Sequence, residues 1–298
     1  MNESNIIQED LYDEHYKKSK KEQSFFRKLI RNRFAAIGLL VIILLLLIAI
    51  FAPLIATHNP NATQVGKSFL TAGIDGHILG TDSYGRDIFS RLIYGSRVSI
   101  MVGVSAVVFG AAFGSFLGLI SGYFGGIVDA IIMRIMDGMM AFPFILLAII
   151  LMTVFGQGLT NVIIAIGIAN IPGFARIVRG QVLTVKEMEY IEVAKSIGAS
   201  NFRIISQHIV PNSIAPLIVY ATMSVAGAIL SEAALSFLGL GVQPPTATWG
   251  SMLQEGKNFL VLNPELATYS GLAILITVLS INLFGDGLRD ALDPKMKI

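Results

Sequence analysis

The chain has 298 residues, of which 54% are apolar and 14% are charged, and its mean hydropathy is +0.69. Because a soluble globular protein carries about a quarter of charged residues, this composition excludes a water-soluble domain and predicts an integral membrane protein. The net charge of +2 gives no general attraction to nucleic acid, and the absence of cysteine excludes disulfides and thiolate metal sites.

Six stretches are long and apolar enough to cross a hydrocarbon core of about 30 Å as helices, which takes roughly 20 residues each. Continuous runs of Leu and Ile in the first stretch do not fit the alternating pattern of a membrane β-barrel. We therefore predict an all-α integral membrane protein with six transmembrane helices. The predicted spans are 35–55, 98–121, 136–155, 161–177, 214–238 and 266–283.

The first 33 residues form a polar tail with a run of Lys and Arg directly before the first span. This position favours an orientation signal and contact with anionic lipid over nucleic-acid binding. Most of the 22 Lys and Arg residues fall on the same side as this tail, so the positive-inside rule predicts that both termini and the loop at about 180–212 are cytoplasmic. The long apolar run of 34–56, with few small residues, is interpreted as an uncleaved anchor facing lipid.

Residues 57–97 are predicted to form an extracellular loop, and residues 98–298 a core of five spans. Within the loop, Asp87 marks a plausible helix start, and the apolar residues after it predict a short helix on the membrane surface. A structural role for this loop is favoured over direct substrate contact. His58 and His77 stand alone in the sequence here, which favours surface roles over metal ligation.

A stripe of small residues runs along the second span at every fourth position. Such a stripe lets another helix approach closely, so this span is predicted to be central. Packing within the subunit and packing against a partner both fit the pattern. The stripe comprises Ala106, Gly110, Gly114, Gly118 and Gly122.

Four polar side chains lie within or at the edges of the spans: Asp137, Asn170, Glu232 and Asn282. An ionisable group there costs about 3 kcal/mol or more on insertion scales, so it is usually kept for a reason. Asp137, Glu232 and Asn282 are candidates for a transport pathway or its gate. The alternative is that Asp137 and Glu232 lie near span ends, reach water or pair with Arg134, and only fix the position of a helix.

The loop between the fourth and fifth spans contains two short amphipathic segments that meet at Gly198 and end at Pro211. Their apolar residues recur at steps of three and four. The first face comprises Met188, Ile191, Ala194 and Ile197, and the second comprises Phe202, Ile205 and Ile209.

This loop resembles the coupling segment of bacterial ABC importer permeases, whose pattern is Glu-Ala-Ala, three residues, Gly, and then Ile-x-Leu-Pro. Val193 and Val210 replace an Ala and the Leu of that pattern. Two further blocks, 80–97 and 230–250, resemble the C-type permeases for dipeptides, oligopeptides and nickel, and the resemblance extends from about residue 30 to the end. The residues that match the coupling pattern are Glu192, Ala194, Gly198, Ile209 and Pro211.

The resemblance implies a permease subunit that forms half of the translocation path of an ATP-driven importer in the bacterial plasma membrane. It implies a homologous B-type permease, two ATPase subunits and an extracellular substrate-binding protein as partners. It further implies no cofactor in this chain, ATP and Mg on the ATPases, and a cytoplasmic coupling helix between the fourth and fifth spans. A di- or oligopeptide is the implied cargo, ahead of nickel, glutathione or a metal-chelator complex. The implied ATPase-coupling residues are Ile191, Glu192, Ala194, Ile197, Gly198 and Phe202.

Enzyme functions fit the sequence poorly. Gly66-Lys67-Ser68 lacks the earlier glycine of a phosphate loop, where Asn61 stands instead, and Leu283 breaks the Gly-x-Gly-Asp pattern of an intramembrane protease before Asp286. The rival to an ATP-driven permease is an ion-coupled secondary transporter that uses Glu232 or Asp137. That rival gives no reason for the coupling segment.

Overall fold

A computed structural model describes residues 29–292, and the regular secondary structure of this part is helical apart from one isolated bridge between Thr81 and Asp87. Five helices are long and apolar enough to cross a membrane, and a bent helix pair makes a sixth candidate. The predicted all-α membrane class is confirmed. The elements are α2 (Arg33–Ile50), α3 (Ala52–Ile55), η1 (Ile74–Gly76), α4 (Ile88–Phe124), α5 (Gly126–Met140), α6 (Phe144–Phe155), α7 (Leu159–Lys186), α8 (Glu189–Ser196), α9 (Asn201–Ile204), η2 (Ile205–Ile209), α10 (Val210–Phe237), α11 (Trp249–Lys257) and α12 (Pro264–Leu292).

The third predicted span, 136–155, is not one helix. α5 already begins at Gly126, and α5 and α6 meet at 94° across a short break. Pro143 lies at this break with an extended backbone (ψ 136°) and directly precedes α6. Because the ring of a proline disfavours helical geometry in the residue before it, the chain turns here instead of continuing.

The second predicted span is longer than the sequence indicates, because α4 runs without interruption from Ile88 to Phe124. Its 37 residues make a helix of about 55 Å, well beyond a hydrocarbon core of about 30 Å. The predicted helix start at Asp87 is confirmed, because its side chain accepts from the amide of Ser90 and caps α4. The predicted short surface helix is wrong, since those residues are the first turns of α4. The boundary predicted at residue 97 likewise falls inside a helix.

The fifth predicted span also begins early. α9, η2 and α10 form one continuous helix from Asn201 to Phe237, so Pro211 does not stop the helix as the sequence predicts. The turn just before this proline is a π-helix, Ile205–Ile209. We attribute the continuity to this wider turn, since Pro has no backbone N–H to donate and needs a local adjustment of the helix.

The centre of the bundle is the contact between α4 and α7, which is the most extensive helix pair in the described structure. The stripe of small residues on α4 faces α7 along this contact. A Cβ atom placed on Gly114 would lie 2.6 Å from the carbonyl oxygen of Ile171, and one on Gly110 would lie 2.8 Å from Cβ of Asn170. The two backbones therefore approach as closely as glycine allows.

α2 lies at the side of the bundle and packs against α12 and α4. Leu40 and Leu44 face outward and are 67% and 55% exposed, as expected for a helix against lipid. Its contact with α12 nevertheless uses small residues, although the sequence of this span contains few of them. Ala35 is fully buried, and a Cβ on Gly38 would lie 2.6 Å from the carbonyl oxygen of Ser280.

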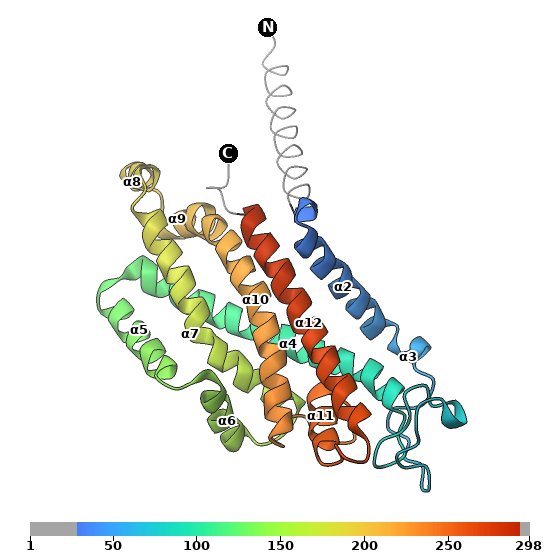
Figure 1. Ribbon diagram of the computed structural model, residues 1–298. Coiled ribbons are helices and arrows are strands. Elements are labelled where there is room, and N and C mark those ends of the chain that lie inside the picture. Colours follow the sequence, from blue (N-terminus) through green and yellow to red (C-terminus); the bar gives the residue numbers. More distant parts are fainter. Residues whose placement is uncertain (1–28, 293–298) are drawn as a thin grey trace.

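The elements separate into two ends of the bundle (Figure 1). α8, α9, the start of α2 and the end of α12 lie at one end, which is the upper end in the figure. α3, α11 and the segment that contains η1 lie at the other end. The segment at 180–212 thus shares an end with the two ends of the described chain.

The close approach of α4 and α7 predicts opposite effects for two glycine substitutions. Gly114→Ala brings a methyl group against the backbone of α7 and should destabilise the fold by about 1 to 3 kcal/mol. Gly180→Ala, in α7 itself, meets nothing within 4 Å and should be neutral or stabilise by up to about 1 kcal/mol. Thermal unfolding of the detergent-purified chain measures both, and equal effects of the two substitutions would contradict the close contact.

Candidate functional site

The segment at 180–212 contains the end of α7, the short helix α8 and the start of the long helix Asn201–Phe237. The predicted glycine junction between two helices is present, but the second helix is not short, because it continues into α10. α8 ends at Ser196, and Gly198 adopts a left-handed conformation with φ of 82°. The amide of Ala199 donates a hydrogen bond of 3.0 Å back to the carbonyl of Ala194, which closes the end of α8. A residue other than glycine would be strained at this turn.

The predicted apolar face of this segment is divided in the structure. Ile191 is fully buried in a cluster with Val182 of α7 and Ile209 of η2, whereas Ile197 is 80% exposed. The reason is geometric: six residues of helix turn through about 600°, which leaves the two side chains about 120° apart. Reading Ile191 and Ile197 as one surface is therefore wrong, and Ile191 together with the buried Ala194 belongs to the core.

A different set of apolar side chains faces outward at this end of the bundle. Phe202 is 80% exposed and Val193 is 60% exposed, and with Ile197 they are the most exposed apolar side chains of this segment. We call these three residues the coupling patch. Glu192 is exposed beside it. Val193 was missed from the sequence, although its i, i+4 spacing to Ile197 could have identified it. An apolar patch rimmed by charges at a helical tip is typical of a protein–protein contact.

Polar contacts fasten the segment to the helices behind it. Tyr123 of α4 donates a hydrogen bond of 2.7 Å to Asn201, and Lys186 donates one of 2.7 Å to the carbonyl of Tyr123. Nearby, Arg179 of α7 binds both carboxylate oxygens of Asp129 at 2.6 Å. The coupling patch therefore rests on a base that is tied to α4, α5 and α7.

The predicted pathway residues do not gather in one place. Asp137 pairs with Arg176 at 2.5 Å rather than with Arg134, and both side chains are about half exposed. Asn282 is half-buried in α12 and makes no hydrogen bond within residues 29–292 through its side chain. Asn170 donates to its own helix, at the carbonyl of Ile166 (2.9 Å).

Glu232 is fully buried and serves as a hydrogen-bond acceptor between helices. Ser236 donates to one carboxylate oxygen at 2.8 Å, and Ser99 of α4 donates to the other at 3.2 Å. Ser99 in turn accepts from the backbone amide of Trp249, at the start of α11. Glu232 thereby joins α4, α10 and α11, and neither reaches water nor pairs with Arg134.

The charged side chains at and just before the start of α4 form ion pairs and hydrogen bonds with other parts of this chain. Asp82 accepts from the Nε of Arg86 at 2.6 Å, and Arg86 also binds Glu255 of α11 at 2.6 Å. Arg91 donates to the carbonyl of Pro60 at 3.0 Å. Asp82, Arg86 and Arg91 are all buried, which supports the structural role of this loop over substrate contact.

His58 and His77 are not isolated, which corrects the sequence interpretation. Their rings stack at 4.4 Å between centroids with planes 25° apart, and His77 lies 2.8 Å from a carboxylate oxygen of Asp87. One possible ligand atom from each of His58, His77 and Asp87 lies within 4.8 Å of the other two, so the three residues form a compact polar cluster. This cluster ties the loop to the first turn of α4.

Asp87 has a pKa below its ordinary value. Burial alone would raise the pKa, but hydrogen bonds from Ser90 and His77 and the nearby His58 outweigh burial and stabilise the carboxylate.

A lowered folded-state pKa contributes stability that is present above the unfolded pKa and is lost as the pH falls through the folded pKa. Thermal unfolding of the wild type should therefore lose more stability than that of Asp87→Asn when the pH is lowered from about 5 to below about 3.9. Parallel pH profiles of the two proteins would contradict a contribution from this carboxylate.

Two parts of the chain match known protein families. Residues 114–298 match the family described as binding-protein-dependent transport system inner membrane component, and residues 23–71 match the N-terminal TM domain of oligopeptide transport permease C. The dipeptide transport system permease protein DppC of Alkalihalophilus pseudofirmus is 47% identical over 91% of this chain and 89% of its own length. The glutathione transport system permease protein GsiD of Escherichia coli O157:H7 is 48% identical over 92% of this chain and 90% of its own length.

Solved structures share the fold. An inward-facing structure of the MetNI methionine ABC transporter superposes with a TM-score of 0.56 at 19% identity, covering 69% of this chain and 98% of that chain. An amino acid ABC transporter gives a TM-score of 0.53 at 15% identity, with coverage of 67% and 94%. These structures support the helical arrangement alone.

Proposed function

Because this chain belongs to the family of binding-protein-dependent transport system inner membrane components, and is a permease subunit of an ABC importer rather than an enzyme, we propose that it forms half of a translocation path for short peptides. It is a multi-pass protein of the bacterial inner membrane. The observation that carries the proposal is the coupling patch, an exposed apolar surface at one end of the bundle.

The coupling patch offers a docking surface for an ATPase subunit. Ile197 and Phe202 project from a helix pair whose buried side is fixed by Ile191, so movement of a bound partner would carry the pair as one piece. Gly198 sets the angle between the two helices. The excess of Lys and Arg on this side supports a cytoplasmic position for the patch and for both termini.

Two ATPases, a homologous B-type permease and an extracellular substrate-binding protein complete the proposed assembly, with ATP and Mg on the ATPases. Half of a path requires another half, and a permease without its own nucleotide site requires an external source of energy. The names of the relatives support a di- or oligopeptide cargo, with glutathione as a close alternative. Proposed segments are a basic tail at 1–33, most of it outside the described residues, an anchor at 34–56, an extracellular loop that ends at Asp87, and a core from α4 onward.

Asp137 and Asn282 are the gate candidates that we retain. The Asp137–Arg176 pair is partly exposed between α5 and α7, so it can open or exchange partners when the helices move. Glu232 is proposed as a fixed polar group behind the path, because its carboxylate is fully buried and held by two hydroxyl groups.

Charged substitutions in the coupling patch should uncouple transport without unfolding the chain. Ile197→Asp combined with Phe202→Asp places two carboxylates on the exposed docking surface, so ATPase binding and stimulated ATP hydrolysis should be lost while membrane insertion is normal. Co-purification of the ATPase and the rate of ATP hydrolysis in proteoliposomes measure this effect.

Val261→Asp is the matched control, because Val261 is 96% exposed and lies in the segment between α11 and α12, at the opposite end of the bundle. It should leave co-purification of the ATPase unchanged. Ile191→Ala should instead reduce the stability of the chain by about 2 to 5 kcal/mol, as for a buried core residue. Full transport by the double Asp variant would remove the coupling patch from the mechanism.

Glu232→Gln distinguishes ATP-driven transport from ion coupling. Gln retains the shape and one oxygen acceptor, and its amide can donate to the second hydroxyl, so an importer driven by ATP should keep substantial uptake. Uptake into proteoliposomes should also persist when the proton gradient is collapsed at constant ATP. Loss of transport in both experiments would favour the ion-coupled alternative.

A further inference from the structure

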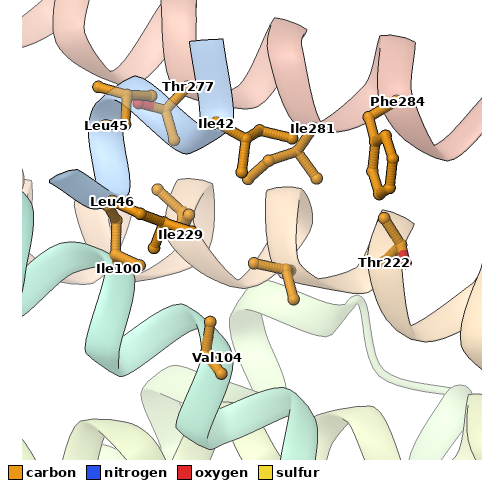
Figure 2. Close-up of a pocket in the computed structure, with 11 residues that line it drawn as sticks. Ile42, Leu45, Leu46, Ile100, Val104, Thr222, Ile229, Thr277, Ile281 and Phe284 are labelled. Atoms are coloured by element: carbon orange, nitrogen blue, oxygen red, sulfur yellow. The ribbon is translucent and has the colours of Figure 1, made fainter. Parts of the chain in front are cut away.

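An apolar cavity of about 210 Å³ lies between α2, α4, α10 and α12. Figure 2 shows side chains from all four helices pointing into it, with Ile42 from α2, Val104 from α4 and Ile281 from α12 around the centre. The remaining lining residues are Leu45, Leu46, Ile100, Thr222, Val225, Ile229, Thr277 and Phe284.

The cavity offers too few polar partners to hold a water molecule. Its polar side chains are two threonines, and each hydroxyl already donates to a carbonyl of its own helix: Thr222 to Ile218 at 2.9 Å and Thr277 to Ala273 at 2.7 Å. A buried water needs two to four polar partners, which this space does not provide. The lining therefore favours an apolar occupant over water.

A second hollow of about 340 Å³ continues from the first toward the start of α4. The two share Leu46, Ile100 and Val104, so they form one path along α2 and α4. The far part of the second hollow is lined by Arg97.

Arg97 is exposed and has no carboxylate partner within residues 29–292. Its guanidinium lies 6.0 Å from the ring centre of Tyr94, one turn earlier. Tyr and Arg together are typical of the level of lipid headgroups, where an aromatic ring and a long cationic side chain reach the interface.

We propose that these two hollows are the binding site of one phospholipid, whose acyl chain lies between α2 and the core and whose phosphate contacts Arg97. The apolar interior selects hydrocarbon, and the cation at its mouth selects a phosphate headgroup. An apolar protein segment would satisfy the cavity but would leave Arg97 without a counter-charge.

The bound lipid has a structural role that follows from where α2 is held. Small residues join α2 to α12 at Ala35 and Gly38, whereas the cavity separates α2 from α4 around Ile42 and Leu46. Ile42 packs against the cluster of α10 and α12 residues over this second part, and the acyl chain fills the remaining space between α2 and α4. This site depends on the membrane position of the helices and not on the cargo or the partners.

The test is photocrosslinking of the full chain, in nanodiscs, to phosphatidylglycerol that carries a diazirine on its acyl chain. Crosslinked peptides should map to the cavity-lining parts of α2, α4, α10 and α12. Val104→Trp fills the cavity and should abolish these crosslinks. Val108→Trp is the matched control, because Val108 is exposed one turn further along α4 and does not line either hollow.

The headgroup contact is tested by lipid retention, measured by native mass spectrometry after transfer to detergent. Arg97→Gln should reduce retention of phosphatidylglycerol about five-fold, the loss expected for one cation at a membrane surface, and Arg97→Lys should restore it. Arg134→Gln, an exposed arginine on α5, should have no effect. Free phosphate should not compete.

Two results would overturn the site. Equal crosslinking in Val104→Trp and wild type would show that the lipid lies elsewhere. If the wild type gives no lipid crosslinks and a protein segment is found in the cavity, the cavity is a binding site for a partner protein and not for lipid. Arg97→Gln is on the surface and leaves the cavity lining intact, so unchanged retention in that variant would reject the headgroup contact without a question of misfolding.

Discussion

The close approach of α4 and α7 is the constraint on which the other contacts depend. Lipid offers helices no hydrophobic gain from associating, so their stability comes from packing, and glycines at every fourth position let two backbones touch. Once α7 is fixed in this way, it presents Arg176 and Arg179 to α5 and presents Val182 to the cluster beneath α8. A side chain larger than hydrogen at Gly114 therefore disturbs both the centre of the bundle and the base of the coupling patch.

The two ends of the bundle are stabilised by different forces. At the end with α11, buried ion pairs and hydrogen bonds join distant parts of the chain, as Arg86 does with Glu255 and Trp249 with Ser99. At the end with α8, apolar packing around Ile191 predominates, and fewer polar contacts hold the segment. Directional polar networks fix one geometry, whereas apolar packing tolerates sliding between alternative arrangements.

Sequence periodicity predicted the class of fold and the approximate positions of the first, fourth and sixth spans, because long apolar runs are local properties of the sequence. Periodicity gave wrong predictions where the outcome depends on the rotation of a helix over several residues or on contacts between distant parts of the chain. A period of three placed Ile191 with Ile197, although helix rotation puts one in the core and the other outside. Pro143 broke a helix and Pro211 did not, and the difference lies in a π-helical turn that composition does not encode. The grouping of His58, His77 and Asp87, and the partner of Asp137, required three-dimensional contacts between residues far apart in sequence.

The uninterrupted helix from Asn201 to Phe237 has a mechanical consequence. Phe202 and Glu232 lie on the same rod, about 45 Å apart along its axis. A helix is stiff along its axis, so displacement at one end reaches the other as tilt or translation and needs no relay of side-chain rearrangements. The helix can bend most easily at the π-helical turn Ile205–Ile209 and at Pro216, where a backbone hydrogen bond is missing. The stiffness of these two positions determines how a displacement at Phe202 is divided between bending of the helix and motion of its distant end.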